Sequence, residues 1–161
     1  GEALATRVGA PLLHVPYKGG APALQGVAGG EVDLAILPYQ TSFDAMQAQG
    51  RLKVVTSFSK ELPTPLAHIP LIGQSQQLPD FAYTISGGYF VKQGCPAERV
   101  SLLRNAIGAA LQNPEIRARL EAEGRTVAQP TGSQAAANQA FDQYLLRVGE
   151  LIRTVGRKPV A

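Results

Sequence analysis

Apolar residues in the first half of the chain form three short runs separated by segments with helical spacing. The runs are residues 12–17 (LLHVPY), 32–37 (VDLAIL) and 52–58 (LKVVTSF), which have the length and composition of buried strands. Pro22 opens a helical pattern that ends at Gly29, and Thr41 or Ser42 opens another that ends at Gly50. Strands that alternate with helices predict an α/β fold, with a parallel sheet and helices on its faces.

Residues 61–79 interrupt this alternation with a proline-rich segment. We expect it to be an ordered crossing segment, because it carries apolar residues to bury, namely Leu66, Ile69, Leu71 and Ile72. Residues 81–91 predict a further strand, which Gly87 and Gly88 interrupt.

The last third of the chain has the pattern of helices. Asn113, followed by a proline and an acid, predicts a helix start, and Thr131 with Gln134 predicts a capping box before the final helix. Residues 2–8 also have helical character but follow no cap or strand. We therefore expect a fold that is incomplete at its N-terminal end.

Composition narrows the class of protein. Hydrophobic residues make up 45% of the 161, and no apolar run reaches the ~20 residues of a membrane span. Residues 1–10 have no signal-peptide pattern. The net charge of +3 comes from basic residues interleaved with acidic ones, which argues against a nucleic-acid partner. The single cysteine excludes an internal disulfide and a zinc site of paired thiolates, and we expect neither metal nor cofactor.

The strongest candidate for a binding site is the segment from His14 to Pro22. It joins a strand, a glycine turn and a helix N-terminus, where backbone N–H groups and the helix dipole favour an anion. An ordinary strand-to-helix connection explains the same pattern. Lys18 could bind a carboxylate there or lie in solvent.

Two other segments could reach the same crevice. Tyr39 and Gln40 follow the second predicted strand, although they could equally fill a turn. Ser86 and Gly87 stand where backbone could approach a ligand, or where a bulge or domain crossing occurs. An enzyme would need Cys95 with His14 or His68, but their spacing matches no catalytic motif, so we expect no catalysis.

Three stretches, HVPYKGGAPAL, GGEVDLA and LKVVTSFSKE, resemble the Bug family of periplasmic receptors, which serve tripartite tricarboxylate transporters. The family's later landmarks follow in order: a proline-rich segment at 63–70, an aromatic glycine segment at 83–91, and helix patterns at 96–103 and 113–124. The resemblance covers nearly the whole chain.

The resemblance implies a type II periplasmic-binding fold of two α/β domains. Residues 1–58 would form the latter part of the second domain. Residues 59–161 would form the crossing segment and the helical part that completes the first. It also implies a periplasmic location, a small carboxylate ligand and transporter subunits as partners of the parent protein. The substrate-binding residues would be Tyr17, Lys18, Gly19, Gly20, Ala21, Tyr39, Gln40, Ser86 and Gly87.

The chain departs from the family pattern at the pocket. Pro38 and Tyr39 stand where many members have Asp-Asn, so the resemblance implies no particular dicarboxylate. A sensing module of the same fold, or a cysteine-dependent enzyme using Cys95, is the alternative function. Because the first wall of the cleft would be missing, we expect the isolated chain to self-associate.

Overall fold

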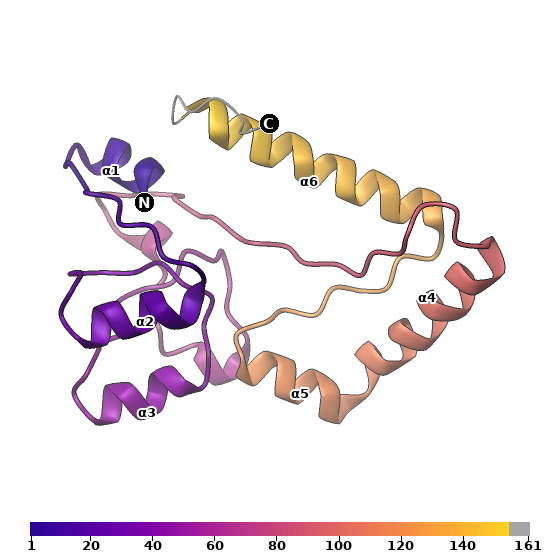
Figure 1. Cartoon of the computed structure of the whole chain (residues 1–161), viewed down its shortest axis with the longest axis horizontal. Coiled ribbons are helices and arrows are strands. Elements are labelled where there is room, and N and C mark those ends of the chain that lie inside the picture. The colour runs from indigo at the N-terminus through magenta and orange to yellow at the C-terminus, as the bar shows by residue number, and fades with distance from the viewer. Residues whose placement is uncertain (155–161) are drawn as a thin grey trace. The chain divides into compact units, whose positions relative to one another are not determined.

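Glycine residues follow the ends of the helices in the first half of the chain. The structure is a computed structural model, and residues 1–154 are described. Helix α1 spans Glu2–Val8 and ends at Gly9 in the left-handed conformation, with φ of 66°. Helices α2 (Gly20–Ala28) and α3 (Ser42–Ala48) follow, each ending next to a glycine turn (Figure 1). Both confirm the helices predicted from the apolar spacing.

The described chain divides into two compact units. The first unit comprises residues 1–84 and 122–125, and the second comprises 85–121 and 126 onward. The boundary between the two domains predicted after residue 58 concerns a whole receptor and stays a prediction. Residues 155–161, which belong to the predicted C-terminal part, lie outside the described residues.

Helices α2 and α3 form the core of the first unit. Leu24 of α2 packs with Phe43 and Met46 of α3, and all three are buried. Leu37, Tyr39, Leu52 and Val54 cover this cluster from the extended segments. Along residues 52–56 half-buried and exposed side chains alternate, which is the period of a strand with one covered face.

The predicted parallel sheet is not confirmed. Among residues 1–154 the structure has one isolated parallel bridge, between Ser57 and Leu71, and no extended strand. The Ser57 N–H donates to the Pro70 carbonyl at 2.8 Å, and the Ile72 N–H donates to the Ser57 carbonyl at 2.9 Å. The pairing goes no further because Pro70 has no N–H and the chain enters a 3-10 turn at Ile72. No backbone hydrogen bond joins residues 12–17, 32–37 and 52–56 to one another in the described chain.

The proline-rich segment is ordered, as predicted. It contains two 3-10 turns, η1 (Thr64–Leu66) and η2 (Ile72–Gln74). Leu66, Ile69 and Leu78 are buried in the first unit, with Leu66 only 3% exposed. Burial of these three apolar side chains therefore holds the segment in place.

The second unit contains the helices α4 (Ala97–Gln112), α5 (Pro114–Ala122) and α6 (Gln134–Thr154), with Ala122 itself counted in the first unit. Asn113 Oδ1 accepts hydrogen bonds from the N–H groups of Glu115 at 2.9 Å and Ile116 at 3.3 Å, which confirms the predicted helix start. None of the helices within residues 1–154 has the length and apolar character needed to cross a lipid bilayer.

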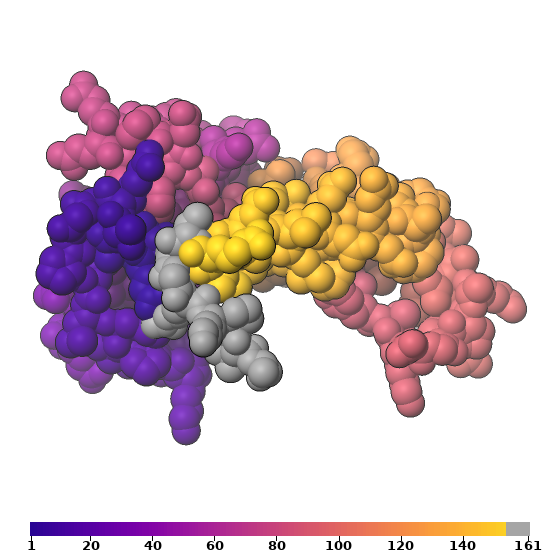
Figure 2. Space-filling model, turned by 90° about the horizontal axis from the view of Figure 1, so that it is seen from above, coloured from indigo at the N-terminus to yellow at the C-terminus, as the bar shows by residue number. Residues whose placement is uncertain are grey.

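The capping box predicted at Thr131 is wrong. The Ser133 hydroxyl accepts the hydrogen bond from the Ala136 N–H at 3.1 Å, so Ser133 caps α6. Gln134 directly follows Ser133, whereas a capping box needs a partner three residues after the cap, and its side chain instead bonds Arg104 and Asn138. Figure 2 shows α6 in the space-filling view, with its colour running from orange toward yellow along the helix.

Candidate functional site

A glycine turn leads from Tyr17 into helix α2. Gly19 has φ of 108° and ψ of 177°, a conformation that is essentially restricted to glycine. Its N–H donates to the Tyr17 carbonyl at 2.9 Å, which folds the chain back on itself. The turn thereby directs the following residues into the first turn of α2.

The start of α2 presents backbone donors. The N–H groups of Gly20 and Ala21 have no carbonyl four residues earlier in the helix to which they could donate. Pro22 lies in the same turn, where the absence of an N–H costs nothing. These two N–H groups and the positive end of the helix dipole make the start of α2 suitable for a carboxylate.

Gln40, which belongs to the second segment predicted to line the site, lies beside this turn. A β-carbon placed on Gly20 would be 3.8 Å from Gln40 Nε2 and 4.0 Å from Leu37 Cδ2. Gln40 therefore borders the first residue of α2, although the two are 20 positions apart in sequence. The structure brings together Gly20 and Gln40, as expected if both line one site.

Tyr39, the neighbour of Gln40 in the chain, contacts two residues of α3. Its hydroxyl donates to Asp44 Oδ1 at 2.6 Å, and its ring meets the ring of Phe43 edge-on, with centroids 5.5 Å apart. Burial, the hydrogen bond and the negative charge of Asp44 raise the pKa of Tyr39 to about 12. Its hydroxyl proton is therefore committed to Asp44.

Tyr17 is arranged in the same manner. Its ring lies so close to Gly26 of α2 that a β-carbon at Gly26 would collide with it. Its hydroxyl donates to Glu31 Oε2 at 3.2 Å. Burial, followed by the hydrogen bond and the charge of Glu31, raises the pKa of Tyr17. Sequence spacing did not reveal Glu31 or Asp44, because each contact joins a loop to a helix or turn.

The other predicted residues are exposed. Lys18 and Ala21 lie at the surface of the first unit, next to Gly20. Ser86 and Gly87 belong to the second unit and are also exposed. Cys95 lies in the second unit, whereas His14 and His68 lie in the first. Within residues 1–154, no three His, Cys, Asp or Glu side chains are grouped where they could hold a metal ion.

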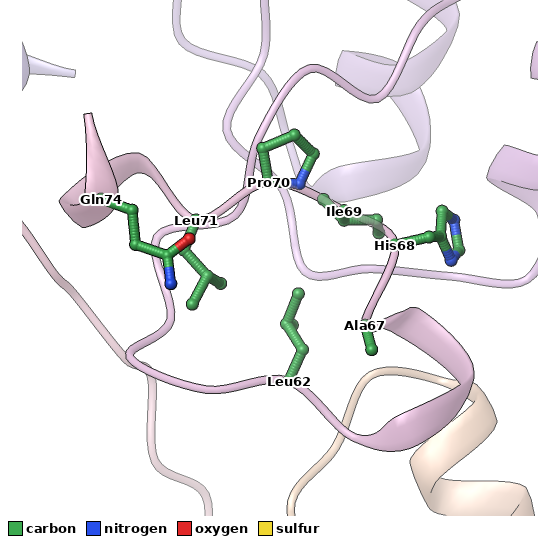
Figure 3. Close-up of a pocket in the computed structure, with 7 residues that line it drawn as sticks. All are labelled: Leu62, Ala67, His68, Ile69, Pro70, Leu71 and Gln74. Carbon is green, nitrogen blue, oxygen red and sulfur yellow. The ribbon is translucent and has the colours of Figure 1, made fainter.

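A shallow cavity of about 250 Å³ lies elsewhere in the first unit, at the proline-rich segment. Its lining is Leu62, Ala67, His68, Ile69, Pro70, Leu71 and Gln74. Leu62 and Leu71 point into it, whereas the His68 imidazole points away (Figure 3). None of the predicted binding residues lines this cavity, and it lacks the backbone donors of the turn at Gly20. We therefore place the candidate site at the start of α2.

Solved structures share this fold. The chain is similar to the periplasmic binding protein BugD, with a TM-score of 0.81 and 26% identity, over 96% of this chain and 51% of that one. It is equally similar to R. palustris Rpa4515, solved with adipate, with a TM-score of 0.81 and 25% identity, over 99% of this chain and 52% of that one. The fold is that of a periplasmic binding protein, and the chain spans about half the length of these two structures.

The sequence matches the family described as tripartite tricarboxylate transporter family receptor over residues 1–157. It is also 30% identical over 152 residues to the UPF0065 protein in the clcB-clcD intergenic region of Pseudomonas knackmussii, covering 92% of this chain and 86% of that protein. The chain belongs to the tripartite tricarboxylate transporter receptor family. The resemblance to the Bug receptors is thereby confirmed.

Proposed function

We propose that this chain is part of a periplasmic receptor that binds a small organic acid for a tripartite tricarboxylate-type transporter and catalyses no reaction. The carboxylate would be held by the backbone N–H groups of Lys18, Gly20 and Ala21, with the Gln40 amide beside them, since the Gly19 N–H is used within the turn. The proximity of Gly20 and Gln40 is the main support for this proposal. It places the side-chain amide of Gln40, a neutral hydrogen-bond donor, beside the N-terminus of α2, so both could bind the same carboxylate. The adipate in Rpa4515 supports a carboxylate as the ligand class.

The remaining parts of the proposal concern the whole receptor. Residues 1–58 and 59–161 would contribute to two different domains, and the extended segments 12–17, 32–37 and 52–58 would pair as a parallel sheet. Ser86 and Gly87 stay predicted ligand-binding residues of the whole receptor. A complete receptor would supply a second wall for the acid, so we expect the 161-residue chain to bind carboxylates weakly.

The test is an NMR titration of the isotope-labelled chain with succinate, glutarate and adipate, which detects weak binding. We expect the largest shifts at the amides of Gly20 and Ala21. Gly20→Val should weaken binding at least about tenfold, or about 1.4 kcal/mol, because its methyl groups would occupy the space beside Gln40. Gly20→Ala is the matched control, since its β-carbon meets only ordinary contacts. An unchanged affinity for Gly20→Val would remove this turn from the site.

A further inference from the structure

The loop that precedes α3 is fixed by contacts around one tyrosine. The Tyr39 hydroxyl is bonded to Asp44, and its ring packs edge-on against Phe43. Its β-carbon also lies against Gly124, where an added β-carbon would be only 3.0 Å away. Gly124 has φ of 75°, so this position favours glycine on conformational grounds as well. Tyr39 is therefore held from three directions in the first unit.

The next residue in the chain is the one that borders the start of α2. The Phe43 N–H donates to the Gln40 carbonyl at 2.9 Å, which holds the Gln40 backbone against the first turn of α3. The Gln40 side chain extends toward Gly20. A rotation of the backbone at Tyr39 would move this amide, because the two residues share a peptide bond.

We propose that Tyr39 is a positioning residue: through its bond to Asp44 and its packing on Phe43 and Gly124, it holds the Gln40 amide at the N-terminus of α2. Tyr39 then contributes to acid binding without touching the acid, since its hydroxyl proton is committed to Asp44. The effect of Tyr39 on acid affinity rests on the proposed function. The placement of the Gln40 amide by Tyr39 can be tested without any acid.

The chain contains a matched control. Tyr17 also donates its hydroxyl to a carboxylate, that of Glu31, but its ring packs on Gly26 rather than on the loop that carries Gln40. Loss of either tyrosine hydroxyl removes one hydrogen bond to a carboxylate in the first unit. Only the loss at Tyr39 should disturb Gln40.

The experiment measures, in the full labelled chain, the nuclear Overhauser effect between the Gln40 side-chain amide and the Gly20 α-protons. We expect it in the parent chain, in Tyr17→Phe and in Asp44→Asn, whose amide oxygen still accepts the tyrosine proton. Tyr39→Phe and Asp44→Ala should lose it. Tyr39→Phe keeps the ring, so its contacts with Phe43 and Gly124 survive and a folded chain is expected.

The same variants are then titrated with succinate, glutarate and adipate. Tyr39→Phe and Asp44→Ala should bind about fivefold more weakly, as for one lost hydrogen bond, whereas Asp44→Asn should bind like the parent. Persistence of the Gln40–Gly20 signal in Tyr39→Phe and Asp44→Ala would overturn the positioning role. If instead the parent chain responds to none of the three acids, the proposed function fails while the Overhauser measurement still decides the role of Tyr39.

Discussion

At the scale of single residues, the two neighbouring glycines of the turn before α2 differ in how strongly the backbone requires glycine. Gly19 has a backbone conformation that other residues adopt only under strain. Gly20 is helical, and a β-carbon there would meet Gln40 and Leu37 at ordinary contact distances. The sequence motif shows both glycines alike, and only the backbone angles show that the conformation favours glycine at position 19 but not at position 20.

This difference predicts the stability of two alanine variants. Gly19→Ala should lower the free energy of unfolding by about 1–3 kcal/mol, because alanine is strained at φ of 108°. Gly20→Ala should change it by no more than about 0.5 kcal/mol, since the site is helical and open. Urea unfolding of the three proteins measures both values. Equal destabilisation by the two variants would contradict the assigned conformation of Gly19.

A second prediction at this scale concerns the pKa of Tyr39, which is raised from 10.0 to about 12. Because the folded chain disfavours the ionised phenol, the contribution of this group to stability is complete below pH 10 and is lost as the pH rises toward 12. The difference in the free energy of unfolding between the parent chain and Tyr39→Phe should therefore shrink between pH 9 and pH 11.5. Because the two proteins differ only in the Tyr39 hydroxyl, the comparison isolates the ionisation of this one group.

Sequence reasoning predicted which segments are neighbours better than it predicted the contacts of their side chains. The order of strand-like runs and glycines placed the Lys18 turn and the residues after Leu37 at one edge, and the structure does bring Gly20 and Gln40 together. The role of Tyr39 could not be read from the sequence. It depends on which acceptor the hydroxyl reaches, and Asp44 becomes available only when α3 folds.

At the scale of elements, helices were predictable and sheet pairing was not. Helix starts depend on a few adjacent residues, and the Asn113 cap before Pro114 is an example that the structure confirms. Strand pairing depends on partners far away in the chain. The runs at 12–17 and 32–37 have strand composition, yet no backbone hydrogen bonds among the described residues pair either run with another strand.

The start of α6 gives a test at this scale. Ser133→Ala should lower the stability of the second unit by about 1 kcal/mol, because it removes the acceptor for the Ala136 N–H. Thr131→Ala is the control and should cost clearly less, since the Thr131 hydroxyl does not cap the helix. Circular dichroism during heating measures the helix content of both variants. A larger loss for Thr131→Ala would restore the capping box predicted from the sequence.

At the scale of the whole molecule, buried apolar residues are unevenly distributed between the units. Among the described residues, the six buried hydrophobic side chains all belong to the first unit; they are Leu24, Phe43, Met46, Leu66, Ile69 and Leu78. In the described part of the second unit, large apolar side chains of α4 and α6 are exposed, with Leu102 at 70% and Leu146 at 66%. Phe90 and Phe141 contact each other, but Phe90 stays 73% exposed.

Apolar helix faces of this kind usually bury themselves against another surface. The solved relatives have about twice the length of this chain, so in them further residues are available to provide such a surface. When the 161-residue chain is alone in solution, a second copy of the chain can cover these exposed apolar faces. We therefore expect the isolated chain to self-associate through the exposed faces of α4 and α6, with an interface of the usual ~1,200–2,000 Å².

Light scattering across a concentration series tests this expectation, which requires a mass above the 17.0 kDa of one chain. Leu145→Glu, at a side chain that is 50% exposed on α6, should shift the chain toward monomer, because association would bury an unpaired charge. Gln143→Glu adds the same charge at an exposed polar position of the same helix and should leave the association unchanged if that position lies outside the interface. A monomer at all concentrations, with the second unit still helical, would show that these apolar faces need no partner.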